Sequence, residues 1–152
     1  MSSDVVEIVA GLRACVFTVG AEAFAFEVRH VREVVVLEEL TAVPGAPPQV
    51  LGVVNLRGDV LPIVDAGPLL GVARRRGDRR LRTLVVVGAG AQVAILIDDV
   101  LGLETFGEIV EAGDVAEKPY AACVLGRMRR GDGFVTLLDV DAVVAALRRR
   151  EG

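Results

Sequence analysis

Several residue types that build catalytic sites are scarce or absent in this sequence. The chain has no tryptophan, one histidine and two cysteines, and its only serines, Ser2 and Ser3, lie outside the predicted fold. A Ser-His-Asp site is therefore excluded, and a Cys-His pair would need His30 beside Cys15 or Cys123. No cysteine–histidine cluster has metal-ligand spacing, so we expect no metal and no cofactor. We predict that the protein is not an enzyme and that His30 is structural.

Basic and aromatic residues are too few for general nucleic-acid binding. Lys118 is the only lysine, and no glycine-rich loop ends in a lysine as phosphate-binding loops do. The net charge is −4 and the isoelectric point is near 5.1, whereas nucleic-acid binding needs a basic face. Aromatic residues make up only 4% of the chain and show no stacking pattern for bases or sugars. After these exclusions, the remaining class of protein is a module that binds other molecules without reacting with them.

The sequence also lacks a recognisable targeting or membrane segment. Its start, MSSDVVEIVAG, has acidic residues where a secretory signal has basic ones. The longest uncharged stretches, Leu40–Leu56 and Thr83–Ile97, are interrupted by proline or glycine and are short for a membrane span. We therefore expect a cytoplasmic protein in which Cys15 and Cys123 are reduced, buried thiols. The cell-adhesion tripeptide at 57–59 would lie in the wrong compartment for that role.

Apolar residues are abundant, and they form a repeat. Of the 152 residues, 53% are hydrophobic, and the mean hydropathy is +0.53. The stretch VLGVVNLRGDVLPIVD begins at Val50 and VLGRMRRGDGFVTLLD begins at Val124; their shared glycines lie 74 residues apart and their shared arginines 73 apart. Such self-similarity indicates two copies of one structural unit. We predict a single domain with copies at about 14–71 and 82–147, joined by an arginine-rich linker at 72–82.

The patterns within each copy predict β-structure. Short β-branched runs separated by glycine turns are typical of small barrels, and Pro62 should lie at a sheet edge or a bulge. Only the segment from Asp139 to Arg149 has a helical apolar period, with Asp139 or Asp141 available to cap it. The expected fold class is mainly β, with two small barrels and a C-terminal helix. Which copy supplies the first strand of each barrel stays open.

Several motifs, in order along the chain, carry a family resemblance. They are LGVVNLRGDVLPIVD at Leu51–Asp65, VREV at Val31–Val34, VPGAPPQVLG at Val43–Gly52, LLG at Leu69–Gly71 and ILIDDV at Ile95–Val100. In these motifs the chain resembles the CheW-like family of bacterial chemotaxis coupling proteins. The resemblance implies two five-stranded SH3-like barrels and a non-catalytic adaptor recruited to receptor arrays. Its implied partners are the regulatory domain of the histidine kinase CheA and the cytoplasmic tip of a chemoreceptor (methyl-accepting chemotaxis protein).

The same resemblance implies an interaction surface. In the family, the positions that match VREV and NLRG face the receptor. We expect Glu33 and Arg57 to meet beside the groove between the barrels, and Asn55 to brace the neighbouring backbone. We expect Val31 and Gly52 to flank the receptor contact. The predicted interaction residues are Val31, Glu33, Gly52, Asn55, Arg57 and Gly58.

The second copy differs from the first at this surface. No asparagine precedes Arg130, and aligning Val31 with Val100 places Gly102 opposite Glu33. The set of Glu33, Asn55 and Arg57 is therefore expected in copy one only. A purely structural hairpin would need it in both copies, so this difference favours a functional role.

Two features depart from the family pattern. Ala66 stands where the family usually has leucine, and the arginine run at 74–82 is not a family feature. That run is a solvated linker or a contact for an acidic partner. The alternative function is a barrel module that binds nucleic acid or a small ligand. A coupling protein should expose apolar patches near Val31 and Gly52, whereas a ligand-binding module should have a deep pocket.

Overall fold

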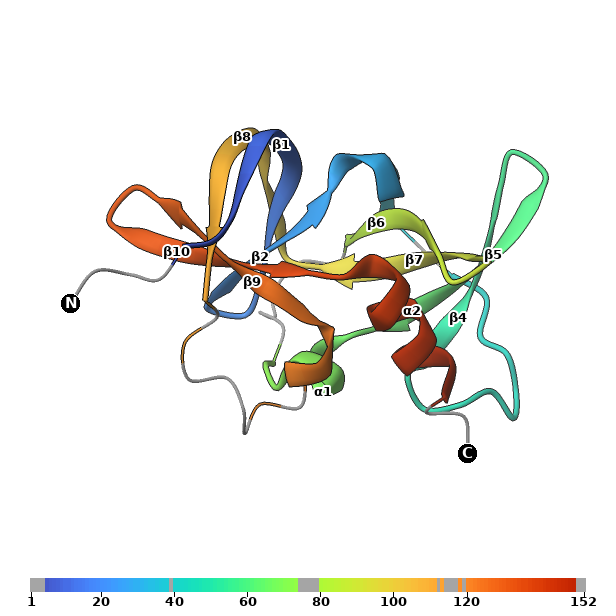
Figure 1. The fold of residues 1–152 in the computed structure, drawn as a ribbon. Coiled ribbons are helices and arrows are strands. Elements are labelled where there is room, and N and C mark those ends of the chain that lie inside the picture. The colour runs from blue at the N-terminus through green and yellow to red at the C-terminus, as the bar shows by residue number, and fades with distance from the viewer. Residues whose placement is uncertain are drawn as a thin grey trace.

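The computed structural model describes residues 5–38, 40–73, 80–111, 113, 118 and 120–149. Within these residues the chain forms ten strands in two five-stranded sheets, with short helices between and after them (Figure 1). The first sheet, on the left in Figure 1, closes into a barrel. Its strands, in spatial order, are β1 (Val5–Val19), β2 (Glu22–Glu27), β10 (Gly133–Leu138), β9 (Val124–Arg130) and β8 (Asp99–Val110).

The second sheet has the same plan as the barrel. In the barrel, β2 lies parallel to β10 and all other pairings are antiparallel; in the second sheet, β7 lies parallel to β5 in the same way. The predicted pair of five-stranded units is therefore confirmed. The strands of the second sheet, in spatial order, are β3 (Val31–Leu37), β6 (Leu81–Gly88), β7 (Ala91–Ile97), β5 (Asp59–Asp65) and β4 (Val50–Leu56).

The two copies exchange strands, which the sequence had left open. Copy one supplies β1 and β2 to the barrel and β3 to β5 to the second sheet, while copy two supplies β6 and β7 to the second sheet and β8 to β10 to the barrel. The crossing in copy one follows the 3₁₀ turn η1 (Val28–His30), which separates β2 from β3. Neither copy can complete a sheet alone, so the pairings of β1 with β8 and of β3 with β6 join the two halves of the chain.

The predicted C-terminal helix is confirmed as α2 (Val140–Arg149). Asp139 caps it, since the Asp139 Oδ1 accepts a hydrogen bond from the Ala142 N–H at 3.3 Å. Asp141 instead accepts a hydrogen bond from the Ala89 N–H at 2.8 Å and ties the helix to the β6–β7 turn. The counterpart of α2 in copy one, α1 (Gly67–Leu70), is short. A 3₁₀ turn, η2 (Ala121–Cys123), precedes β9.

One hydrophobic core is shared by both sheets and α2. Phe24 of β2, Ile95 of β7 and Val143 of α2 belong to the same buried cluster, so the two sheets pack as one unit. Both cysteines are buried and form no disulfide with each other, which agrees with the prediction of reduced, buried thiols. Burial raises the pKa of the Cys15 thiol because the charged thiolate loses its hydration.

Two further sequence predictions have different outcomes. Pro62 was expected at an edge or a bulge; it lies on β5, between β7 and β4, at a position where β5 pairs with β4 alone and is locally an edge. The pairing of β5 with β7 begins only at Ile63, so no rung of that ladder needs an N–H from Pro62. The arginine-rich linker prediction falls mainly on residues 74–79, outside the described part of the chain, while Arg82 belongs to β6.

Candidate functional site

The structure brings Glu33 and Arg57 together, as the sequence predicted. The Arg57 Nη1 donates a hydrogen bond to the Glu33 Oε2 at 2.5 Å. Glu33 lies on β3 and Arg57 in the turn between β4 and β5, so the ion pair joins the two end strands of the second sheet. The Arg57 side chain is 75% exposed and the Glu33 side chain 25% exposed. A pair this open to water adds only about 0–1 kcal/mol to stability.

The β4–β5 turn holds Arg57 in an uncommon backbone conformation. Arg57 has a φ of 51° and Gly58 a φ of 90°, the double positive φ that characterises type I′ hairpins. A left-handed conformation is unfavourable for arginine and persists only where its surroundings impose it. Asn55 provides this support, since its Oδ1 accepts a hydrogen bond from the Gly58 N–H at 3.0 Å. The prediction that Asn55 braces the neighbouring backbone is confirmed.

The location of the ion pair differs from the expectation. We expected it beside the groove between the barrels, but both residues belong to the second sheet and its β4–β5 turn. In Figure 1 the β4–β5 hairpin projects at the end of the molecule opposite β1 and β8. The groove was expected from the family resemblance, and the structure instead places the pair within one sheet, which contains β3, β4 and β5.

The set of Glu33, Asn55 and Arg57 was expected in copy one only, and for the acid–arginine pair this expectation is wrong. The Arg130 Nε lies 2.8 Å from the Glu104 Oε2 and 3.0 Å from the Glu104 Oε1. Gly102 does occupy the position equivalent to Glu33, and Glu104 lies two residues further along β8, where it points to the same face. An ion pair between a hairpin arginine and a neighbouring strand is therefore common to both copies.

The two Arg-Gly-Asp triplets are not structurally equivalent. In copy one the turn residues are Arg57 and Gly58, whereas in copy two they are Gly131 and Asp132, and Arg130 is still the last residue of β9. Arg130 consequently has an ordinary extended backbone. What is particular to copy one is the left-handed arginine braced by Asn55, and this narrower feature is the functional candidate.

Gly52 is buried beneath a neighbouring segment. A Cβ at this position would lie 2.5 Å from the Thr41 carbonyl oxygen and would also collide with the Leu40 side chain. Thr41 and Val53 exchange two backbone hydrogen bonds, at 2.9 and 3.3 Å, which hold that segment against β4. Gly52 thus permits a close backbone approach. Its place in the interaction set stays a prediction, and any effect on a partner would be indirect.

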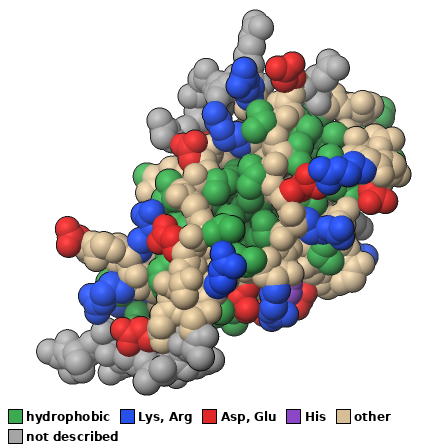
Figure 2. Space-filling model, turned by 90° about the horizontal axis from the view of Figure 1, so that it is seen from above, with side chains coloured by type: hydrophobic (Ala, Val, Ile, Leu, Met, Phe, Trp, Pro, Cys, Tyr) green, Lys and Arg blue, Asp and Glu red, His purple; other side chains and the backbone are tan. Residues whose placement is uncertain are grey.

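Apolar side chains are exposed along two strands with equivalent positions in the two sheets. Val34 and Val36 on β3 are 46% and 49% exposed, and Leu101 and Leu103 on β8 are 42% and 57% exposed. Figure 2 shows apolar side chains gathered in the centre of the upper face, bordered by charged side chains. Val31, by contrast, is half-buried and packs against the shared core. An exposed apolar strip next to Val31 is what a coupling protein was expected to show.

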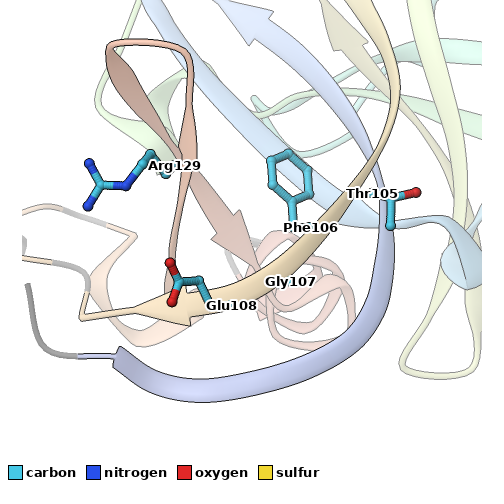
Figure 3. A pocket seen from close by; sticks show the side chains of 5 residues that line it. All are labelled: Thr105, Phe106, Gly107, Glu108 and Arg129. Carbon is cyan, nitrogen blue, oxygen red and sulfur yellow. The ribbon is translucent and has the colours of Figure 1, made fainter.

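A shallow cavity on the barrel is not lined by the residue types that form a catalytic site. It has a volume of about 410 Å³ and includes Glu108 of β8 and Arg129 of β9 in its lining. In Figure 3, Phe106 and the Arg129 guanidinium lie on opposite sides of the hairpin ribbon. No nucleophile with an adjacent base lines this cavity, and the described residues contain no group of three potential metal ligands. His30 lies 3.0 Å through its Nδ1 from the Val87 carbonyl oxygen, which fits its predicted structural role.

Comparison with known proteins gives one consistent result. Residues 13–148 match the CheW-like domain family. The chain is 33% identical over 147 residues to the chemotaxis protein CheW of Rhizobium meliloti, covering 91% of each chain. It is 26% identical to the chemotaxis protein CheW of Thermotoga maritima, covering 90% of this chain and 89% of the other. The fold is similar, with a TM-score of 0.77 and 23% identity, to the scaffolding protein TtCheW of Thermoanaerobacter tengcongensis, covering 88% of this chain and 92% of that one.

No described helix reaches the length and apolar character needed to cross a membrane.

Proposed function

The chain belongs to the CheW-like domain family, and from this premise we propose that it couples transmembrane chemoreceptors to the histidine kinase CheA. Like the other members of this family, it is a chemotaxis scaffold protein and has no enzymatic activity. The observation that carries the proposal is the extent of the family match, which includes both sheets and α2 almost completely. Coupling in this sense means holding two proteins together, so it needs binding surfaces and no reactive group.

The proposed kinase contact is apolar. Val34 and Val36 on one sheet, and Leu101 and Leu103 on the other, leave apolar area uncovered in the isolated chain. Exposed apolar area of this kind marks protein–protein contacts when it is contiguous. We propose that the CheA regulatory domain, a module of similar architecture, covers part of it. Because such a contact contains few charges, its affinity should depend only weakly on salt concentration.

The proposed receptor contact includes the β4–β5 turn. Arg57 and Gly58 are exposed at its tip, and Glu33 and Asn55 fix the arginine side chain and the turn backbone, respectively. Such pre-organisation reduces the entropy lost when a partner binds. Val31 and Gly52 are proposed to flank this surface, on β3 and β4, respectively. Binding of a receptor tip would bring the protein to the membrane-associated receptor array.

Arg57→Ala tests the receptor contact, and Arg130→Ala is its matched control. Both variants remove an arginine from an exposed ion pair at a hairpin, so both should melt close to the wild-type temperature. Only Arg57→Ala should weaken binding to a receptor cytoplasmic tip, by about tenfold or more, and reduce receptor-dependent CheA activity. Binding to the isolated CheA regulatory domain should be unchanged in both. Equal receptor binding by the two variants and the wild type would refute the role of Arg57.

A further inference from the structure

A second cavity lies on the second sheet, away from the Glu33–Arg57 pair. Its volume is about 270 Å³, just below the ~300–1,000 Å³ of pockets that hold drug-sized ligands. The β3–β4 loop, β4, β5, β7 and the end of α2 form its walls. Its lining includes two prolines, a valine, two glutamines and an arginine: Pro47, Pro62, Val93, Gln49, Gln92 and Arg148.

Gln49 lines this cavity, and no described residue donates a hydrogen bond to its side-chain oxygen. The residue is only 7% exposed, and its Nε2 donates a hydrogen bond to the Leu147 carbonyl oxygen at 2.7 Å. Because the Leu147 carbonyl can only accept, the amide atom that faces it is the nitrogen, and the other amide atom is the oxygen Oε1, an acceptor. No donor from the described part of the chain bonds to it. Buried amide oxygens almost always have a donor, and here the cavity is the space from which a donor can come.

A cation lies at the rim of the same cavity. The Arg148 Nη1 donates to the Ala89 carbonyl oxygen at 3.2 Å, which holds the exposed side chain in place. The guanidinium group has further N–H donors in its plane and can bind a carboxylate. Between Gln49 and Arg148 the walls are mostly apolar, with Pro47, Pro62 and Val93 among them.

We propose that this cavity is a binding site for a small carboxylic acid with an apolar body and one N–H donor, of the N-acylated apolar amino acid class. The N–H of the ligand would donate to the Gln49 Oε1, the aliphatic side chain would pack against the proline and valine walls, and the carboxylate would bind Arg148. The cavity shares β4 and β5 with the proposed receptor surface, but the site does not depend on the proposed coupling function.

A ligand series tests the three contacts separately. The full-length protein is titrated by calorimetry and by NMR with N-acetyl-leucine as the probe. Three analogues each lack one feature: N-acetylglycine lacks the apolar side chain, 2-acetoxy-4-methylpentanoate has an ester oxygen in place of the N–H donor, and N-acetyl-leucinamide lacks the carboxylate. N-acetyl-leucine should bind saturably and shift the Gln49 side-chain amide signals, and each analogue should bind at least about fivefold more weakly.

Variants locate the site. Arg148→Gln and Gln49→Met should each weaken N-acetyl-leucine binding by about tenfold, while Arg29→Gln, which alters an exposed arginine paired with Glu27, should leave it unchanged. If Gln49→Met does not fold, because Gln49 also binds the end of α2, Arg148→Gln and the analogue series decide. The absence of saturable binding, equal binding of all four compounds, or shifts confined to another part of the molecule would overturn the proposal.

Discussion

Gly52→Ala should destabilise the fold although it adds a single methyl group. The new Cβ would lie 2.5 Å from the Thr41 carbonyl oxygen, well inside van der Waals contact, and would also meet the Leu40 side chain. Forcing extra volume into a packed site costs about 1–3 kcal/mol. Replacing glycine also restricts the unfolded chain, which offsets about 0.4–1 kcal/mol. The steric term is larger, so the net effect is a loss of stability.

Thermal melting checks this, with Gly107→Ala as the matched control. A Cβ at Gly107, also in a strand, would meet nothing within 4 Å, and its φ lies outside the left-handed region. For a chain of this size each kcal/mol lowers Tm by about 2–4 °C, so Gly52→Ala should melt several degrees below wild type. Gly107→Ala should melt at or above the wild-type temperature. Amide exchange at Thr41 and Val53 should accelerate in Gly52→Ala only, because their mutual hydrogen bonds must open. Equal melting temperatures for both variants would refute the packing role of Gly52.

Two further predictions concern Asp139, which caps α2, and the buried thiol of Cys15. Asp139→Ala should lower the free energy of unfolding by about 0.5–2 kcal/mol in denaturant titrations because it removes the cap of α2; exposed Asp132→Ala is the control, and equal losses would contradict the assignment. Burial raises the pKa of Cys15 above its ordinary 9.0, so its stabilising contribution is complete below that pH and is lost as the pH rises above it. A thiol reagent at pH 8 should therefore modify Cys15 only after unfolding, and rapid modification of the folded protein would count against its burial.

The sequence correctly identified the residues of the functional candidate, but the comparison of the two copies that supported it was partly wrong. The NLRG stretch pointed to Asn55 and Arg57, and the structure confirms both the bracing bond of Asn55 and the pairing of Arg57 with Glu33. The argument from the missing acid in copy two was wrong because the alignment compared single positions. Glu104 is two residues from the aligned position, and on a strand that spacing keeps a side chain on the same face.

The sequence by itself determined what depends on short-range pattern. β-branched runs with glycine turns predicted strands, and the apolar period after Asp139 predicted a helix. Only the tertiary structure decided which strands pair. β1 pairs with β8 to close the barrel, and β3 pairs with β6 in the second sheet. No local pattern encodes pairings across such separations; they form because they bury one core shared by both sheets. The covering of Gly52 by Leu40 and Thr41, and the meeting of Gln49 with the end of α2, are consequences of that packing.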